Sequence, residues 1–422
     1  MSAPKIAILH YSSAPVVGGV ESVMREHSRL FAHAGYTVTI FSGRGDQVDE
    51  DVQFHHFPLF GSSEPHILAI KEELDQGNVP ADFELVKDEI LLFLNQKMSD
   101  FDTIFAHNIC SLHKNLPLTA ALHAFLLQNE HINLISWDHD LAWINGQYRP
   151  QLFHAYPWYL LKQTWHPTRH QHVTISEMRK EELMQLLGEN APPVRAIPSG
   201  IDWQSLLHLG DQALDIIDHY HLTKAFPVLF LPARITRRKN LEQAITIMHA
   251  LREYYPTAAL VISGPLGPHN PKNRTYFEEL KQLTRQHDLD HPYKNGSAKV
   301  IFLAEYTNGF LPMRTIYDLF RFTDALLFPS LQEGFGIPIL EAGMANMPIF
   351  CSDIPPFHET AGEMAHYFDP AGDPGQIAKL MHTVISASKT LTHKNHVRQN
   401  YTWNNIFTKQ IEPLVLSKKK RE

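Results

Sequence analysis

Short apolar runs alternate with longer amphipathic stretches along most of the chain. The first run, Lys5–Tyr11, is followed by a glycine pair and then by apolar spacing that predicts a helix over Val20–His33. Gly35 ends this helix, and a second apolar run follows at Tyr36–Phe41. Apolar runs that are bounded by turn residues and separated by helices indicate β-α-β units on a parallel sheet. Further strands are expected at Val52–Phe57, Phe101–Ala106, Ile132–Trp137, His172–Ile175 and Val194–Ile197.

The same rhythm restarts in the second half of the chain. Pro227–Ala233 predicts a strand, and the apolar spacing after it predicts a helix over Asn240–Tyr255 with Asn240 as its N-cap. Because a polar, irregular stretch over 202–225 separates the two series, we place a domain boundary there. The pattern therefore predicts two α/β domains in tandem. The later strands are expected at Ala258–Ser263, Lys299–Leu303, Ala325–Phe328 and Met347–Cys351.

Three segments depart from this rhythm. Phe60–Met98 carries many acidic residues and is interpreted as an insertion that caps a cleft. Trp143–His172 is dense in tryptophan, tyrosine, histidine and proline. The end of the chain is expected to form a short helix followed by a solvated basic tail, Lys418–Arg421.

Composition narrows the class of protein. Lysine and arginine number 37 against 45 aspartate and glutamate residues, so the net charge is −8 and a general nucleic-acid binder is not favoured. No stretch reaches the roughly 20 apolar residues that span a bilayer, and the first residues do not resemble a secretory leader. The two cysteines, Cys110 and Cys351, are expected to be free thiols, and the chain is expected to be cytoplasmic. The 27 histidines show no metal-binding spacing.

Two segments at expected strand ends carry ligand-binding chemistry. Gly18–Gly19 lies between a strand and a helix, where glycines let a backbone approach a ligand and the helix N-terminus favours anions. The segment Leu231–Asn240 places several cations after the first strand of the second domain. Ligands of open α/β sheets bind beyond the carboxyl ends of strands, and cations there suit a diphosphate. These cations are Arg234, Arg237, Arg238 and Lys239.

The most specific signal is a pair of glutamates eight residues apart, Glu333 and Glu341. Glu333 precedes the Gly334–Gly336 turn, and Glu341 lies within the helix expected from about Pro338. Both carboxylates can accept hydrogen bonds from sugar hydroxyls. A glutamate among apolar neighbours needs a partner or a cleft.

These motifs together resemble those of the retaining glycosyltransferases of family 4, from about Lys5 to Val415. That family has the GT-B fold, in which two Rossmann-like domains face a deep cleft. The resemblance implies an acceptor-side domain over 1–203, a donor-binding domain over 204–400, and a closing helix over 401–416 that packs on the first domain. The motifs that carry it are Gly18–Gly19, Ile197–Asp202, Arg234 with Lys239, Glu333 with Glu341, and Tyr401–Trp403.

The resemblance also implies residue roles. Gly19 approaches the β-phosphate of the donor, and Arg234 and Lys239 hold the diphosphate and stabilise the leaving nucleotide. Glu341 binds the ribose, while His139 lies near the transferred sugar. The implied catalytic residues are His139, Arg234, Lys239 and Glu333. The implied donor-binding residues are Gly18, Gly19, Arg234, Lys239, Glu333, Gly334, Phe335, Gly336, Ile337 and Glu341.

The implied reaction moves a hexose from a UDP- or GDP-hexose to an acceptor hydroxyl with retention, so that an α-glycosidic bond forms. The leaving phosphate can act as the base, and stabilisation of the diphosphate is then the largest contribution of the protein. No tightly bound cofactor and no obligatory metal are expected. The expected partners are a nucleotide sugar and a small-molecule or glycan acceptor, which is soluble rather than lipid-linked, with no nucleic acid and no integral membrane span.

Other readings stay open at this point. Asp138 and Asp140 form an Asp-x-Asp pattern, which binds Mn²⁺ or Mg²⁺ in GT-A glycosyltransferases. The GT-B fold also serves sugar-nucleotide epimerases and phosphorylases, and a non-enzymatic sugar-nucleotide-binding subunit is a further alternative. Ser199 stands where the family usually has asparagine.

The acceptor site is the part that the sequence describes least. Aromatic residues within Trp143–His172 either line a sugar- or lipid-binding wall or pack in the core. Arg149 and Arg169 in the same stretch are candidates to receive an anionic acceptor. The aromatic residues are Trp143, Tyr148, Trp158, Tyr159 and Trp165.

Overall fold

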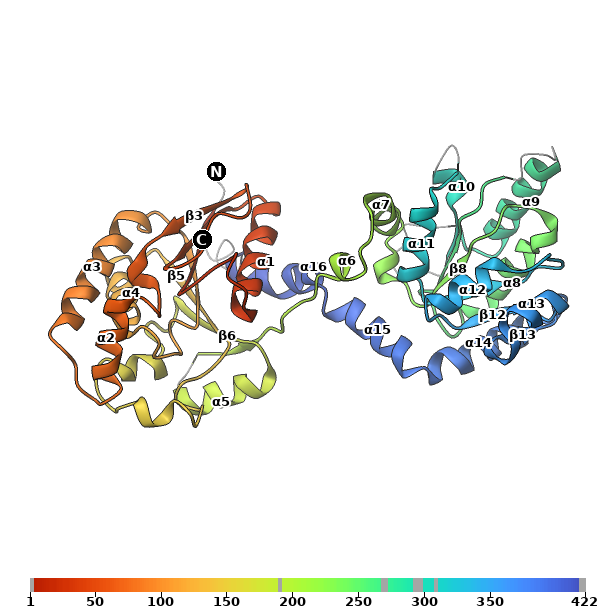
Figure 1. Cartoon of the computed structure of the whole chain (residues 1–422). Coiled ribbons are helices and arrows are strands. Elements are labelled where there is room, and N and C mark those ends of the chain that lie inside the picture. Colours follow the sequence, from red (N-terminus) through yellow and green to blue (C-terminus); the bar gives the residue numbers. More distant parts are fainter. Residues whose placement is uncertain (1–3, 189–191, 267–271, 291–298, 307–309, 417–422) are drawn as a thin grey trace. The chain divides into compact units, whose positions relative to one another are not determined.

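The chain divides into two compact units (Figure 1). The computed structural model describes residues 4–188, 192–266, 272–290, 299–306 and 310–416. Unit 1 comprises Met1–Gly200 together with Trp403–Glu422, and unit 2 comprises Ile201–Thr402. Unit 2 is therefore one continuous stretch, whereas unit 1 is built from both ends of the chain.

Unit 1 contains a seven-stranded parallel sheet with the order β3-β2-β1-β4-β5-β6-β7. The order runs outward from β1 in one direction and from β4 in the other, so the switch point lies between these two strands. The strands are β1 (Lys5–His10), β2 (Thr37–Ser42), β3 (Val52–His56), β4 (Thr103–His107), β5 (Asn133–Asp138), β6 (His170–Thr174) and β7 (Arg195–Ala196). The main helices are α1 (Gly19–His33), α2 (Pro65–Leu74), α3 (Asp82–Lys97), α4 (Leu116–Gln128), α5 (Glu177–Leu187), α16 (Trp403–Ile406) and α17 (Glu412–Leu416).

Helical layers cover both faces of this sheet. Successive residues of β1 point to opposite faces, so Ile6 and Ile8 join one apolar core while Ala7 and Leu9 join another. The first core also contains Phe31 of α1 and residues from the end of the chain. Burial on both faces explains why the strands are continuous apolar runs. The C-terminal residues buried in the first core are Trp403, Ile406, Phe407, Ile411 and Leu414.

The interpretation of Phe60–Met98 as a cap over a cleft is wrong. The segment forms α2 and α3, whose apolar stripes lie in the second core of unit 1. Phe83 and Ile90 of α3 are fully buried, and α3 packs on α4. The acidic residues that suggested an insertion lie on the opposite, exposed face of these helices.

The aromatic segment Trp143–His172 divides between core and surface. Trp143 and Trp158 are buried in the second core, which favours the packing alternative for these two side chains. Arg169 donates to the carbonyls of Leu126, Asn129 and Ile132, where it caps the end of α4. Its guanidinium therefore has a structural function, in contrast to the expected acceptor contact.

Unit 2 repeats the same design with a six-stranded parallel sheet, ordered β10-β9-β8-β11-β12-β13. Its switch point lies between β8 and β11. The strands are β8 (Val228–Leu231), β9 (Ala259–Ile262), β10 (Lys299–Phe302), β11 (Ala325–Phe328), β12 (Ile349–Ser352) and β13 (His366–Phe368). The helices are α6 (Trp203–Leu206), α7 (Asp211–His219), α8 (Leu241–Leu251), α9 (Lys272–Gln286), α10 (Leu303–Tyr306), α11 (Met313–Phe322), α12 (Ile337–Met344), α13 (Pro355–Ala361), α14 (Pro374–Ala387) and α15 (Lys389–Asn400).

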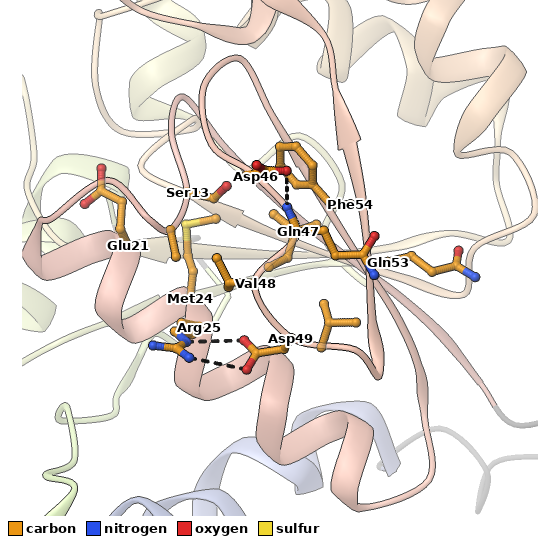
Figure 2. A pocket seen from close by; sticks show the side chains of 13 residues that line it. Ser13, Glu21, Met24, Arg25, Asp46, Gln47, Val48, Asp49, Gln53 and Phe54 are labelled. Carbon is orange, nitrogen blue, oxygen red and sulfur yellow. Dashed lines mark hydrogen bonds and ion pairs between the residues drawn. The ribbon is translucent and has the colours of Figure 1, made fainter. Parts of the chain in front are cut away.

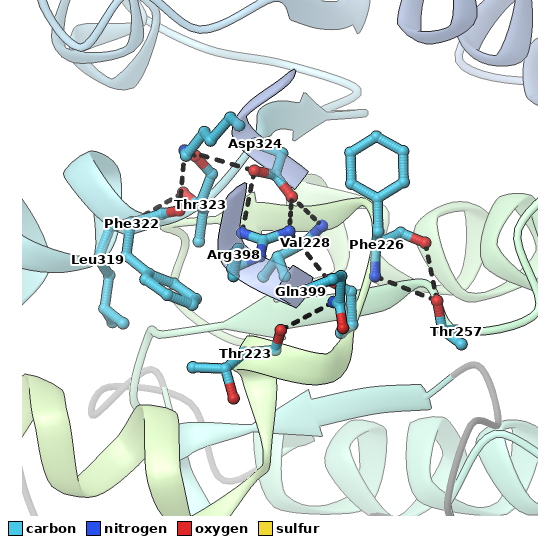
Figure 3. Close-up of polar contacts among 12 residues, drawn as sticks. Thr223, Phe226, Val228, Thr257, Leu319, Phe322, Thr323, Asp324, Arg398 and Gln399 are labelled. Atoms are coloured by element: carbon cyan, nitrogen blue, oxygen red, sulfur yellow. Dashed lines mark hydrogen bonds and ion pairs between the residues drawn. The ribbon is translucent and has the colours of Figure 1, made fainter. Parts of the chain in front are cut away.

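A buried ion pair between Arg398 and Asp324 attaches α15 to this sheet (Figure 3). Arg398 of α15 donates to both carboxylate oxygens of Asp324, at 3.2 and 2.8 Å, and Asp324 also accepts from the backbone N–H of Val228 at 2.8 Å. Burial alone would raise the pKa of the Asp324 carboxyl, but Arg398 and Lys394 hold that pKa below its usual value. The pair joins α15 to the first residues of β8 and to the residue before β11.

Two details differ from the sequence expectations. Asn240 lies at the N-cap position of α8, but its backbone is left-handed with φ of 53° and its side chain donates to the carbonyl of Pro370, so it does not cap the helix. The stretch expected to be an irregular boundary contains α6 and α7. Within the described ranges, no helix is long and apolar enough to cross a membrane. The basic tail Lys418–Arg421 lies outside the described residues.

Candidate functional site

In unit 2, the predicted donor-site residues gather at the switch point of the sheet. The cationic segment follows β8, and the segment with Glu333 follows the neighbouring strand β11. A hydrogen bond of 2.8 Å from the Leu331 N–H to the Arg238 carbonyl joins the two loops. The loop after β8 packs against Gly264, which follows β9. A Cβ at Gly264 would lie 1.9 Å from the carbonyl oxygen of Ala233, so only glycine allows this close approach.

Lys239 and Glu333 form an ion pair at the centre of this group. Nζ of Lys239 donates to Oε1 of Glu333, and the two side chains are only 10% and 9% exposed. Arg238 donates to Oε2 of Glu333 at 3.0 Å, and the Lys239 ammonium lies 4.7 Å from the centre of the Phe328 ring. The carboxylate thus receives two cations, and one of them is held in a nearly buried position.

The pair shifts the titration of both groups. Burial lowers the pKa of the Lys239 ammonium below its usual value. Burial alone would raise the pKa of the Glu333 carboxyl, but the hydrogen bond and charge of Lys239 lower it. Glu333 is therefore a carboxylate near neutral pH, and the Lys239 side chain beside it is poorly hydrated. A poorly hydrated cation at a strand end binds an anionic ligand more strongly than one in water.

The other cations of this segment differ in their contacts. Arg237 pairs with Glu279 at 2.6 Å and lies 4.6 Å from the ring centre of Tyr276, so it is engaged with α9. Arg234 is exposed and makes no hydrogen bond or ion pair with another described residue. Its guanidinium is therefore available for a ligand at the same strand end.

The glycine turn after Glu333 leads directly into α12. Gly336 is the N-cap residue, with φ of 99°, and a Cβ there would lie 2.9 Å from the Phe357 ring. No side chain caps this helix; Pro338 has no N–H and the Ile339 N–H donates to the Gly336 carbonyl at 2.9 Å, so the Ile337 N–H is the one that remains available among the first three helix residues. Phe335 and Ile337 are exposed beside the turn, and burial raises the pKa of the Glu341 carboxyl within α12. The helix begins at Ile337 with Pro338 in its first turn, as the sequence predicts.

In unit 1, the glycine pair lies at the start of α1, after the loop 11–17 that follows the switch-point strand β1. Gly18 is the N-cap residue in an extended conformation, and Gly19 begins the helix. A Cβ at Gly19 would meet no atom within 4 Å, so the backbone is open to a ligand there. Glu21 accepts a hydrogen bond of 2.5 Å from the Ser12 hydroxyl, which ties the helix start to the preceding loop.

A small hollow lies between α1 and the loop that follows β2 (Figure 2). Arg25 and Asp49 form an ion pair of 3.2 Å across its rim, and Met24 and Val48 line it. Its free volume is about 10 Å³, which is room for a single water molecule. This hollow therefore belongs to the packing of unit 1 and is too small for a sugar.

His139 lies directly after β5, in unit 1. Nε2 of His139 is 3.1 Å from Nδ1 of His107, the last residue of β4, and the two rings stack with 5.4 Å between their centres. Burial lowers the pKa of His139 to about 4, and the histidine is therefore neutral at physiological pH. Sequence reasoning missed His107 and also His10, the last residue of β1. The signal that could have found them is a histidine at the end of each central strand.

The two aspartates beside His139 do not form a metal site. Asp138 is buried and accepts from the Ser136 hydroxyl at 2.9 Å, whereas Asp140 pairs with Arg179 and accepts from the Leu141 N–H. Because β5 ends at Asp138, Asp140 lies in the loop after the strand. Within the described ranges, no group of three or more metal-ligating side chains converges.

Comparisons with known proteins agree with this organisation. A family model described as glycosyl transferases group 1 matches residues 216–401, and one described as glycosyltransferase family 4 matches residues 17–205. Mannosylglucosylglycerate synthase of Petrotoga mobilis is 24% identical over 306 residues, 68% of each chain. The Thermotoga maritima protein of the same name is 22% identical over 385 residues, 83% of each chain.

A third relative and a solved structure extend the comparison. The O-antigen chain mannosyltransferase RfbU of Salmonella typhimurium is 43% identical over 72 residues, 17% of this chain and 19% of that protein. The sucrose-phosphate synthase from Thermosynechococcus elongatus aligns with 99% of this chain and 100% of its own, with a TM-score of 0.41 and 15% identity. The family models, which together span most of the chain, and the two doubly wound parallel sheets lead to one conclusion: the chain belongs to glycosyltransferase family 4 and is a GT-B enzyme that acts on nucleotide sugars.

Proposed function

We propose that the protein is a retaining hexosyltransferase that moves a hexose from a GDP- or UDP-sugar to an acceptor hydroxyl. The observation that carries the proposal is the nearly buried Lys239–Glu333 pair at the β8–β11 switch point of unit 2. The names of the relatives, which are mannosyltransferases or form a mannosyl product, make mannose the first sugar to test. The acceptor is proposed to be soluble, and the relatives' product name makes glucosylglycerate the first candidate.

In this proposal, the unit 2 residues bind the donor. Arg234 and Lys239 contact the diphosphate, and the positive charge stabilises the negative charge that develops as the nucleotide leaves. Glu333 and the backbone of the Gly334–Ile337 turn contact the transferred sugar, while Glu341 accepts hydrogen bonds from the ribose. Gly18 and Gly19 allow the backbone of unit 1 to approach the β-phosphate, and His139 contacts the sugar.

The proposed chemistry needs no side-chain nucleophile. The acceptor oxygen attacks the anomeric carbon on the face from which the diphosphate departs, and a phosphate oxygen takes the proton of the acceptor hydroxyl. The bond from the anomeric carbon to the phosphate oxygen breaks as the new glycosidic bond forms. The products are an α-glycoside and a free nucleoside diphosphate.

The test begins with donor binding. The full chain is mixed with GDP-mannose, UDP-glucose, ADP-glucose or dTDP-glucose, and its melting temperature is measured. A ligand that binds only the folded protein raises the melting temperature, and a concentration of 100 times Kd adds about 2.7 kcal/mol. The best donor is then incubated with glucosylglycerate and other soluble glycosides.

Product analysis decides the reaction. The proposal expects release of nucleoside diphosphate only when an acceptor is present, together with an α-linked product identified by proton NMR. A β-linked product would overturn the retaining mechanism. Conversion of the nucleotide sugar into an isomer without an acceptor would identify an epimerase instead.

A further inference from the structure

Three histidines stand at the ends of three neighbouring strands in unit 1. The sheet order places β1, β4 and β5 side by side, with His10 ending β1, His107 ending β4, and His139 directly after β5. His107 is fully buried, and His10 is 5% exposed. Burial lowers the pKa of His10 and of His139 to about 4 each and holds the pKa of His107 well below its usual value, so all three rings are neutral near pH 7.

The tautomer of His10 follows from its hydrogen bond. Nδ1 of His10 lies 2.7 Å from the backbone carbonyl oxygen of His107. A carbonyl oxygen accepts only, so Nδ1 of His10 carries the ring proton. In a neutral ring, Nε2 of His10 is then unprotonated and acts as a hydrogen-bond acceptor.

The tautomer of His139 follows from the surroundings of His107. Nδ1 of His107 and Nε2 of His139 are 3.1 Å apart, and one of these two atoms must donate to the other. If His139 donated, the neutral ring of His107 would carry its proton on Nε2, which is buried and has no partner in the described part of the chain. A buried N–H without an acceptor is rarer and more costly than an unused acceptor. His107 therefore donates, and the proton of His139 lies on Nδ1.

The backbone around His139 is fixed as well. Asn108 follows His107 in a left-handed conformation, with φ of 58°. Its side-chain oxygen accepts a hydrogen bond of 2.8 Å from the backbone N–H of His139. Nδ1 of His139 has no hydrogen-bond partner among the described residues, so this N–H is available to a ligand.

We infer that His107 is a positioning residue that holds each of its two histidine neighbours in the tautomer with the ring proton on Nδ1. The backbone carbonyl of His107 keeps the proton of His10 on Nδ1, which leaves Nε2 of His10 as an acceptor. The ring of His107 donates to Nε2 of His139, which leaves Nδ1–H of His139 as a donor. The His139 donor and the His10 acceptor, at the ends of the two strands that flank β4, match the hydroxyls of a sugar, which both donate and accept. The inference rests on the proposed function for the identity of that ligand, but the tautomers can be measured without any ligand.

Nitrogen-15 NMR of the full-length chain labelled at histidine tests the tautomers. Signals are assigned by their loss in His10→Gln and His139→Gln variants. The expected result is a proton on Nδ1 of both rings. In His107→Phe, which keeps a ring in the core, His139 is expected to become a mixture of tautomers while His10 is unchanged, because the carbonyl that fixes His10 remains.

Two further variants serve as controls. His107→Asn places an amide N–H near the former Nδ1 and is expected to restore the His139 tautomer. The His27 ring is fully buried, and its centre lies 5.4 Å from that of His107. The nitrogens of His27 have no hydrogen-bond partner in the described ranges, so His27→Phe is expected to change neither tautomer. A wild-type His139 with its proton on Nε2, or a His139 tautomer unaffected by His107→Phe, would overturn the inference.

Steady-state kinetics then separates this inference from the proposed function. We expect His107→Phe to lower kcat about tenfold with little change in KM, the loss of one hydrogen bond. His107→Asn is expected to recover most of this loss.

Full activity of a His139→Ala variant would contradict the role proposed for His139 and leave the tautomer result intact. If kcat fell strongly in His139→Ala but not in His107→Phe, the positioning role of His107 would be refuted, whereas the role proposed for His139 would stand. If His107→Phe does not fold, the wild-type spectrum still decides the tautomers.

Discussion

At Lys239, burial of the side chain and its ion pair with Glu333 have opposite effects on the charged ammonium. An ammonium loses much of its hydration when its side chain is only 10% exposed, and the Glu333 carboxylate compensates for that loss. In the proposed function, an incoming diphosphate brings further negative charge toward the same ammonium. The lysine is therefore held in place before the ligand arrives, and little reorganisation is needed when charge develops.

Removal of this ammonium should affect catalysis far more than removal of a neighbouring cation. We expect Lys239→Ala to lower kcat/KM for the nucleotide sugar by about 100-fold or more, a loss typical of a preorganised charge contact. Arg237→Ala is the matched control, because Arg237 is in the same turn but binds Glu279. Initial rates of nucleoside diphosphate release measure both. Similar losses in the two variants would indicate a general effect of charge.

The sequence predicts the charged residues of this site but not how they pair. Lys239 and Glu333 lie 94 positions apart, so their contact depends on β8 and β11 being neighbours in the sheet. His107 was missed for a similar reason, since its importance comes from the strand next to it. A buried histidine has no distinctive local pattern in the sequence.

At the scale of elements, β11 matches its prediction residue for residue, because a continuous apolar run between Asp324 and Pro329 defines a buried strand. The three-residue strand β13 was not predicted, since it is too short to show a pattern. The prediction of a cap is wrong for the segment that contains α3, because it rests on the number of acidic residues and not on their positions along the helix. Phe83, Val86, Ile90 and Leu94 form a buried stripe at helical spacing.

The position of α3 in the core leads to a stability prediction. Phe83→Ala should lower the free energy of unfolding by about 3–5 kcal/mol, because the ring is fully buried. Leu85→Ala on the same helix should change it by less than about 0.5 kcal/mol, because that side chain is 69% exposed. Urea unfolding monitored by circular dichroism compares them. If both substitutions changed the free energy of unfolding by the same small amount, the segment would not be part of the core.

The attachment of α15 gives a second stability prediction. Arg398→Met should lower the free energy of unfolding by about 3–5 kcal/mol, since it leaves the Asp324 carboxylate buried without its main partner. Lys180→Met, which removes the exposed pair with Glu177, should cost less than about 1 kcal/mol. Thermal and urea unfolding of both variants test the contrast, which fails if the two losses are equal.

The same aspartate makes stability depend on acid. Its pKa in the folded chain is lowered, so its contribution is fully present above the unfolded value of about 3.9 and is lost as pH falls through the folded value. We expect the stability difference between wild type and Asp324→Asn to stay constant near neutral pH and to shrink below about pH 4. If the stability difference between wild type and Asp324→Asn grew as the pH fell, the pKa of Asp324 would be raised in the folded chain and not lowered.

At the scale of the whole molecule, the repeated strand rhythm predicts two α/β folds because each sheet needs its own series of β-α-β units. Both sheets have the same relative strand order, and in both the motifs that we propose to bind ligands follow the strands at the switch point. The sequence does not reveal that order directly. It follows from the way right-handed crossovers wind outward from a central pair of strands.

The return of the chain to unit 1 can be tested by truncation. A protein that ends at Thr402 lacks the five buried apolar side chains that α16 and its successors add to unit 1. We expect unit 1 of this variant to lose its cooperative unfolding, while unit 2, which is continuous, keeps its own transition. Differential scanning calorimetry separates the two. Lys409→Ala, at an exposed position in the same segment, is the control and should leave both transitions in place.

The split composition of unit 1 also imposes an order on biosynthesis. Ribosomes add about 5–20 residues per second, and unit 2, Ile201–Thr402, is translated between the two parts of unit 1. The nascent unit 1 therefore waits roughly 10–40 seconds with the binding place of Trp403 and Phe407 uncovered. During this time, unit 2 can emerge and fold first, although it comes second in the sequence. The earlier domain is completed last, and its exposed apolar surface is where a chaperone would be needed.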